Sequence, residues 1–154
     1  MTNNDILRRL RYTFDLTDSK MMKLSGMADQ EVSRAQISDW LKKEDDPAYQ
    51  SCNDRQLAII LNNFINEKRG KREGPQPEPE KVLNNNIIFR KLKIALNLKS
   101  EDVIAMLALA DFKMSEHELS AFFRKPEHKH YRACKDQVLR NFLKGMQLTY
   151  RPLG

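Results

Sequence analysis

The apolar residues of this chain recur at helical spacing, in two matching series. Near the start, Ile6, Leu7, Leu10 and Phe14 would share one helix face, and 82 residues later Ile88, Phe89, Leu92 and Leu96 repeat that stripe. Three further stripes repeat at the same shift: Met21, Met22 and Leu24 correspond to Val103, Ile104 and Met106, Ile37, Trp40 and Leu41 to Leu119, Phe122 and Phe123, and Leu57, Ile60, Leu61 and Phe64 to Leu139, Phe142, Leu143 and Met146. The pattern predicts four amphipathic helices in each copy, about eight in all.

Polar residues at the predicted helix starts support this division. Ser33 with Gln36, and Ser115 with Glu118, have the spacing of capping boxes that open the third helix of each copy. Short polar side chains also stand where caps are needed: Asn3 or Asn4 and Asn85 or Asn86 for the first helix, and Asp54 and Asp136 for the fourth. Asp18 and Ser100 stand at the start of the second helix.

The two copies align without a gap, which indicates a tandem duplication. We expect an all-α fold with residues 1–69 as the first helical repeat and residues 84–154 as the second. Residues 70–83 between them carry Pro75, Pro77 and Pro79 at alternate positions, and prolines cannot occupy a helix interior. This segment is predicted to be a Pro-rich, semi-rigid linker.

Composition narrows the class of protein. The chain has 154 residues, 40% of them hydrophobic, and a formal net charge of +6, which favours a soluble protein with nucleic acid or acidic protein surfaces as partners. Its five glycines argue against glycine-rich phosphate loops. With no long apolar stretch and no signal-like N-terminus, we expect no membrane association and a cytoplasmic location.

One polar motif occurs in both repeats. Tyr49, Cys52 and Asp54 are matched by Tyr131, Cys134 and Asp136. The three residue types could build a polar site. They could equally be a structural loop in which the tyrosine enters the core, the cysteine packs beneath it and the aspartate caps the next helix. We favour the structural interpretation, because capping alone explains the aspartate.

Catalytic and metal-binding signals are weak. His128, His130 and Cys134 cluster in sequence, but the equivalent residues of the first repeat are Asp46, Ala48 and Cys52, and zinc needs three or four ligands. No nucleophile elbow, zinc-protease motif or phosphate loop is present. We therefore predict no catalytic residue, no metal and no cofactor, and a protein that is not an enzyme.

Positive charge is the more suggestive repeated feature. Basic residues occupy five equivalent positions, on the first helix and at the end of the third: Arg8, Arg9, Arg11, Lys42 and Lys43, matched by Arg90, Lys91, Lys93, Arg124 and Lys125. They could form one phosphate-binding patch per repeat, or simply complement helix C-termini. The order of the second and third helices would also suit a helix-turn-helix, but residues 26–32 are long for its turn, and Asp39 and Glu116 on the third helices would repel phosphate.

Several segments together resemble a known family. Asn4–Arg8, Trp40–Asp45, Glu67–Lys71, Asn84–Asn86 and Tyr131–Gln137 are similar to the YehS-like family of small bacterial proteins. The resemblance implies a duplicated all-α fold and a free-standing cytoplasmic bacterial protein. It implies no activity and no site residues, because the family is of unknown function.

The sequence thus predicts a protein that acts by binding. The first hypothesis is a nucleic-acid-binding or regulatory module that uses the duplicated basic residues. The alternative is a protein–protein interaction adaptor that receives a partner in a groove between the two repeats.

Overall fold

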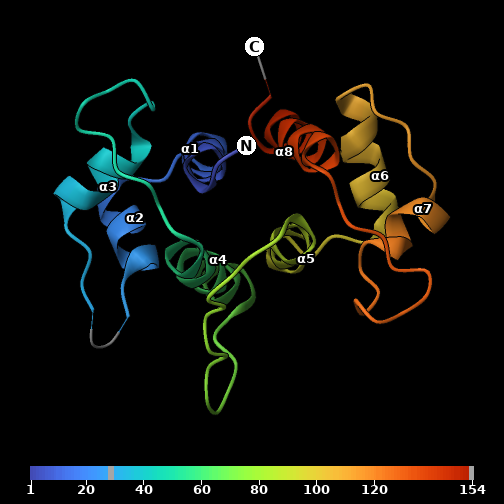
Figure 1. Ribbon diagram of the computed structural model, residues 1–154, viewed down its shortest axis with the longest axis horizontal. Helices are drawn as coiled ribbons and strands as arrows, with labels where there is room; N and C mark the ends of the chain where they lie inside the picture. Colours follow the sequence, from blue (N-terminus) through green and yellow to red (C-terminus); the bar gives the residue numbers. More distant parts are fainter. Residues whose placement is uncertain (28–29, 153–154) are drawn as a thin grey trace. The chain divides into compact units, whose positions relative to one another are not determined.

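The computed structural model describes residues 1–27 and 30–152, which form eight α-helices and no β-strand (Figure 1). The first four are α1 (Asn3–Phe14), α2 (Asp18–Ser25), α3 (Arg34–Leu41) and α4 (Asp54–Arg69). The second four are α5 (Asn85–Ala95), α6 (Ser100–Leu109), α7 (Glu116–Ala121) and α8 (Asp136–Tyr150). The expected all-α tandem duplication is confirmed.

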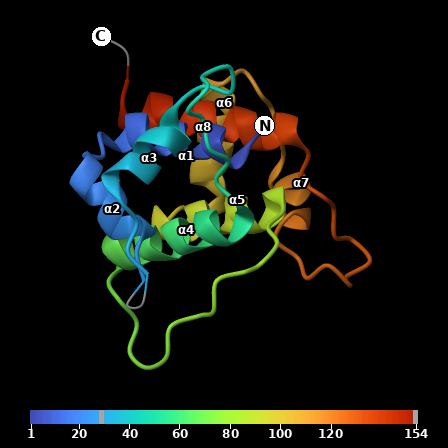
Figure 2. The ribbon, with the colours of Figure 1, turned by 60° about the vertical axis from the view of Figure 1, so that its left-hand side comes forward.

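The chain divides into two compact units, Met1–Leu83 and Asn84–Gly154. Within the first unit α2 packs on α3 and α4, and α1 packs on α3 and α4. Within the second, α6 packs on α7 and α8, and α5 packs on α8. Figure 2 shows the stretch that follows α4 as a chain without helix, and it begins at Gly70, whose φ of 87° ends the helix.

The two cores fill the same fold with different residues. In the second unit the ring of Phe89 lies 4.5 Å from that of Phe142 and 5.1 Å from that of Phe123. The three equivalent residues of the first unit are aliphatic: Leu7, Ile60 and Leu41. The helical arrangement therefore depends on apolar burial at these positions rather than on aromatic contacts.

Several helices begin one residue earlier than expected. The capping boxes at Ser33 and Ser115 form as predicted, with both backbone and side-chain bonds in place. Asp18 and Ser100 begin α2 and α6, as predicted. The other caps are the residues before those predicted: Thr2 and Asn84 for α1 and α5, and Asn53 and Lys135 for α4 and α8. The predicted residues fall inside the helices, and the side chains of several of them hold other parts of the fold.

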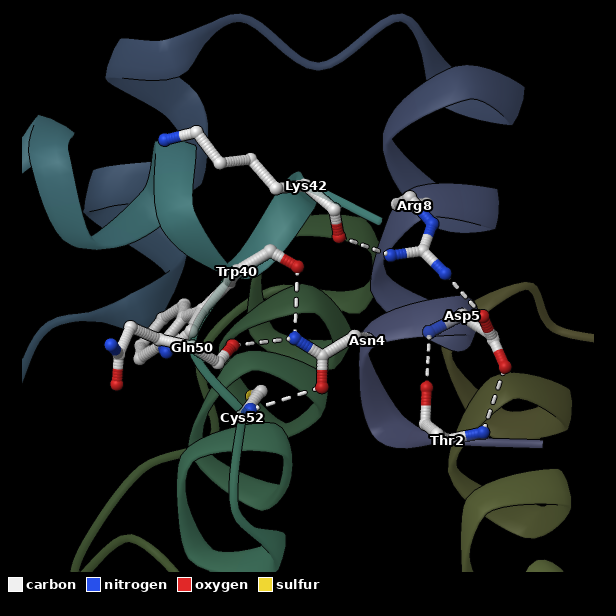
Figure 3. Close-up of polar contacts among 8 residues, drawn as sticks. All are labelled: Thr2, Asn4, Asp5, Arg8, Trp40, Lys42, Gln50 and Cys52. Carbon is white, nitrogen blue, oxygen red and sulfur yellow. Dashed lines mark hydrogen bonds and ion pairs between the residues drawn. The ribbon is translucent and has the colours of Figure 1, made fainter. Parts of the chain in front are cut away.

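Asn4 is the residue with the most important of these other roles (Figure 3). Its amide nitrogen donates to the carbonyl oxygens of Trp40 and Gln50, both at 2.9 Å, and its side-chain oxygen accepts from the backbone nitrogen of Cys52 at 3.0 Å. The residue is only 1% exposed. One buried side chain thus fixes both ends of the segment that joins α3 to α4.

Asn86 makes the same three bonds in the second repeat. Its nitrogen donates to the carbonyl oxygens of Phe122 and Arg132, and its oxygen accepts from the nitrogen of Cys134, at 2.9 to 3.0 Å. Asn86 is 3% exposed. Hence residues 42–53 and their equivalents, residues 124–135, are held on identical scaffolds although their sequences differ.

The repeated Tyr-Cys-Asp motif belongs to this scaffold. Cys52 and Cys134 are buried, and burial, with a smaller contribution from the neighbouring aspartate, raises the pKa of each thiol to about 12. Tyr49 and Tyr131 are half-buried, so the expectation that they enter the core is wrong. The backbone nitrogen of each tyrosine closes a turn of its segment, by donating to the carbonyl of Asp46 or of His128.

The aspartates of the motif do not cap α4 and α8, because each is the first residue of its helix. Asp54 accepts from Asn3 at 2.8 Å and from the backbone nitrogen of Leu83 at 2.8 Å. Asp136 accepts from Asn85 at 2.7 Å, and this bond is the leading cause of its lowered pKa. The aspartates therefore tie the first helix of each repeat to the start of the last.

Candidate basic surface of the second repeat

Three of the five candidate basic residues of the first repeat are paired with carboxylates. Arg8 pairs with Asp5, and its guanidinium also donates to the carbonyl oxygen of Lys42 at 2.8 Å (Figure 3). Arg11 lies 3.0 Å from a carboxylate oxygen of Asp18, and the ammonium of Lys42 lies 2.6 Å from Asp39. Three of the five basic residues expected to bind phosphate thus have an anion already in place.

The pKa of Asp5 reflects its position at the start of α1 beside Arg8. Burial alone would raise this pKa, but hydrogen bonds from Thr2 and the charge of Arg8 outweigh burial and lower it. Asp5 therefore remains charged beside Arg8.

The second repeat lacks all three carboxylates. The residues equivalent to Asp5, Asp18 and Asp39 are Ile87, Ser100 and Ala121. Among the described residues, none of the basic side chains at Arg90, Lys93, Arg124 and Lys125 has an ion pair. The second repeat has basic residues at these positions but lacks the carboxylates that pair with them in the first repeat.

These four residues lie on α5 and directly after α7, and together they are here called the α5–α7 basic surface. Arg90 and Lys93 lie one turn apart on α5, on the helix face that begins with Asn86. The ammonium of Lys93 lies 5.3 Å from the ring centre of Phe123, and Arg124 and Lys125 follow that ring directly. The bond from Asn86 to the carbonyl of Phe122 holds α5 against the end of α7.

Exposure differs across the surface. Arg90 and Lys125 are exposed, whereas Lys93 and Arg124 are half-buried. The Nε atom of Arg124 is buried without a hydrogen-bond partner. A half-buried cation that lacks a counter-ion is held in an environment of reduced dielectric, where its attraction for an incoming anion is stronger than in water.

The segment that follows α7 adds to this charge. Residues 124–135 contain five lysines and arginines and one glutamate, whereas residues 42–53 contain two lysines and three acidic residues. Over residues 84–154 there are thirteen lysines and arginines against seven acidic residues, so this repeat carries a formal charge of +6. Residues 1–69 contain eleven of each and are neutral.

The other expected phosphate-binding residues are not gathered in the same way. Arg9 is half-buried, and burial lowers its pKa. Lys91 is half-buried and has an interaction of its own. Lys43 is exposed, but Glu44, Asp45 and Asp46 follow it directly.

The third helix of the second repeat, α7, is short and begins with negative charge. α7 has six residues, and its first turn exposes Glu116 and Glu118 to solvent. Hydrogen bonds from Ser115 lower the pKa of Glu118, with a smaller effect from Arg132, so this carboxylate stays charged. Positive charge is found at the end of α7 and not at its start.

The histidine and cysteine residues do not assemble into a metal site. The imidazoles of His128 and His130 are exposed with their ring centres 5.6 Å apart, while Cys134 is buried. Within residues 1–27 and 30–152, no three histidine, cysteine, aspartate or glutamate side chains come close enough to hold a metal ion. Over the same residues, no helix has both the length and the apolar character needed to cross a membrane.

Sequence reasoning missed the roles of Asn4 and Asn86 and the loss of counter-ions. Both could have been found from features of the sequence. The Asn-Asn pair is identical at the 82-residue shift, which an exposed helix cap does not require. The charge difference appears when carboxylates, and not only basic residues, are compared between the repeats.

Comparison with known proteins gives the family. A family model described as "Protein of unknown function (DUF1456)" matches residues 3–70 and again residues 85–152. The chain belongs to this family. It is also 43% identical over 147 residues, covering 95% of this chain and 94% of the other, to the uncharacterized protein YehS of Escherichia coli strain K12. No solved structure matches the chain.

The two family matches coincide with the two sets of four helices, so the duplicated unit is the family's own building block. The resemblance to YehS seen in the sequence is confirmed. Neither comparison names an activity.

Proposed function

We propose that this protein binds polyanions, with nucleic-acid phosphates as the ligand class, through the α5–α7 basic surface of its second repeat. The observation that carries the proposal is the absence, at residues 87, 100 and 121, of the carboxylates that neutralise the equivalent cations of the first repeat. Uncompensated cations repel one another, and a bound phosphate chain removes that repulsion.

This proposal places the phosphate-binding surface in the second repeat only, whereas the sequence predicted one patch in each repeat. In the first repeat, a phosphate would have to displace Asp5, Asp18 or Asp39 from its partner. In the second, it would displace only water and counter-ions. Binding should therefore be confined to one repeat, largely independent of sequence, and steeply dependent on salt.

The salt dependence can be estimated. Each phosphate contact contributes about 0.9 to the slope of log affinity against log salt, so four cations give a slope of about −3 to −4. The same relation makes one contact worth about eightfold in affinity at 0.1 M salt. Without base-specific contacts, the dissociation constant near physiological salt should be about 1 to 100 µM.

The duplication offers a matched pair of variants. Lys125→Glu and Lys43→Glu make the same charge change at equivalent, exposed positions. We expect Lys125→Glu to weaken binding of a labelled 24-base-pair duplex at least eightfold at 0.1 M salt, and Lys43→Glu less than twofold, by fluorescence anisotropy.

Two results would refute the proposal. Equal losses in the two variants would show that net charge, and not the second repeat, attracts the duplex. No anisotropy change at 50 mM salt, with protein up to about 100 µM, would show that the chain does not bind nucleic acid.

A further inference from the structure

The turn that follows α7 is closed by a histidine, and the equivalent turn of the first repeat is closed by an aspartate. Nδ1 of His128 accepts from the backbone nitrogen of His130 at 3.0 Å. In the first repeat, Oδ1 of Asp46 accepts from the backbone nitrogen of Ala48 at 2.9 Å. Residues 46 and 128 are equivalent, so the two side chains accept equivalent hydrogen bonds in equivalent turns.

The surrounding backbone bonds confirm that the turns match. The nitrogen of His128 donates to the carbonyl of Lys125 and that of Tyr131 to the carbonyl of His128, both at 2.9 Å. In the first repeat, the nitrogen of Asp46 donates to Lys43 and that of Tyr49 to Asp46, both at 3.0 Å. The residue that closes the turn is therefore the relevant difference.

The two acceptors respond differently to acid. An imidazole nitrogen accepts a hydrogen bond only while its lone pair is free, and a protonated imidazole is a donor at both nitrogens. Histidine is the side chain whose ordinary pKa, about 6.5, lies near neutral pH, whereas an aspartate keeps accepting far below that pH. The bond to His130 is thus present only while the His128 imidazole is neutral.

The charged groups near His128 come from its own segment. His130 contacts the imidazole ring, and Lys125, Glu127, Lys129 and the phenol of Tyr131 are its neighbours along the turn. The ring is exposed, and within residues 1–27 and 30–152 neither imidazole forms an ion pair with a carboxylate from α5, α7 or any other element. A proton taken up here adds to the positive charge that begins at Lys125.

We propose that His128 is a proton-responsive closure of the 128–130 turn. Acidification opens the turn and places a further positive charge beside the α5–α7 basic surface, which strengthens its binding of phosphate chains. The binding half of this inference rests on the proposed function, whereas the opening of the turn does not.

The turn is tested directly by nuclear magnetic resonance. In the wild-type protein, the amide of His130 should shift and lose protection from exchange between pH 8 and pH 5.5, in step with the His128 ring, while the amide of Ala48 stays constant. His128→Asn keeps an acceptor that does not titrate, and should make the residue-130 amide constant as well. Asp46→His should transfer the pH response to Ala48. A His130 amide that stays unchanged while the His128 ring titrates would overturn the proposal.

Binding is measured on the same variants by anisotropy with the labelled duplex at 0.1 M salt. At pH 8 the wild type and His128→Asn should bind the duplex equally. At pH 5.5 the wild type should bind about eightfold more tightly than His128→Asn, which is the effect of one added phosphate contact. Equal gains on acidification would overturn the binding half. If no variant binds at either pH, the proposed function fails, and the amide measurement still decides whether the turn opens.

Discussion

Replacing Asn4 with alanine should destabilise the first repeat far more than an ordinary polar substitution. The change removes three hydrogen bonds at once: the two that Asn4 donates to the carbonyls of Trp40 and Gln50, and the one it accepts from the backbone nitrogen of Cys52. All three backbone groups lie beside a side chain that is 1% exposed, so water cannot readily replace the lost partner.

The expected cost follows from these bonds. A net loss of about 1 to 1.5 kcal/mol for each bond, increased by the penalty for burying backbone groups without partners, gives about 3 to 5 kcal/mol. The whole free energy of unfolding of a domain is about 5 to 15 kcal/mol. The variant should therefore be close to the limit of stability.

The sequence supplies its own probe for the assay. Trp40 is the chain's one tryptophan, and it is buried in the first repeat beside the Asn4 bond. Urea unfolding followed by tryptophan fluorescence therefore reports on this repeat, and the midpoint should fall by about 2 M at a slope of about 2 kcal/mol/M.

Asn3→Ala is the matched control. Asn3 is adjacent and is also an asparagine, but it is half-buried and makes two bonds, to the carbonyl of Cys52 and to Asp54. Its replacement should cost about 1 to 2 kcal/mol. If Asn4→Ala costs no more than Asn3→Ala, the buried asparagine does not hold the segment after α3 and the reasoning is wrong.

Two further predictions concern packing and the thiols. Gly145→Ala should lower the free energy of unfolding by more than about 2 kcal/mol in thermal melts followed by circular dichroism, because the added Cβ would lie 1.9 Å from the carbonyl oxygen of Met106. The control is Asn63→Ala at the equivalent position, which should cost about 1 kcal/mol for its lost bonds to Leu24 and Gly26. A Gly145→Ala variant as stable as the wild type would show that α6 and α8 can move apart without cost. Cys52 and Cys134 should react slowly with a thiol reagent at pH 8 and rapidly in urea, because burial raises their pKa values to about 12. Since the folded pKa is the higher one, the thiols should leave stability constant below about pH 9 and reduce it between pH 9 and 12, and fast native labelling at pH 8 would contradict their burial.

The helices could be predicted from the sequence because the interactions that form them are local. Helical periodicity, capping boxes and an ungapped repeat each depend on residues a few positions apart, and these predicted eight helices correctly. The cap positions were wrong by one residue because Asn4 and Asp54 were judged by their neighbours in sequence. Their actual partners, Cys52 and Leu83, lie 48 and 29 residues away.

The candidate site divides in the same manner. Comparison of the repeats identified Arg8 and Arg90 as equivalent cations. Asp5 lies three residues before Arg8, whereas Ile87 lies three residues before Arg90, so this difference was available from the sequence. The pairing of Arg11 with Asp18 joins two helices and is set only by their packing. Once that geometry is known, Ile87 and Ser100 explain why the charge of the second repeat remains uncompensated.

By itself, the sequence determined that the chain is a duplicated helical protein, since apolar spacing and caps act within one helix. Only the tertiary structure decided the pairing of Arg11 with Asp18, which lie on different helices. For two such residues, the distance between the charges is set by how the helices pack. The same applies to Asn4 and Asn86, whose side chains bond backbone atoms that the fold brings together from 36 to 48 residues away.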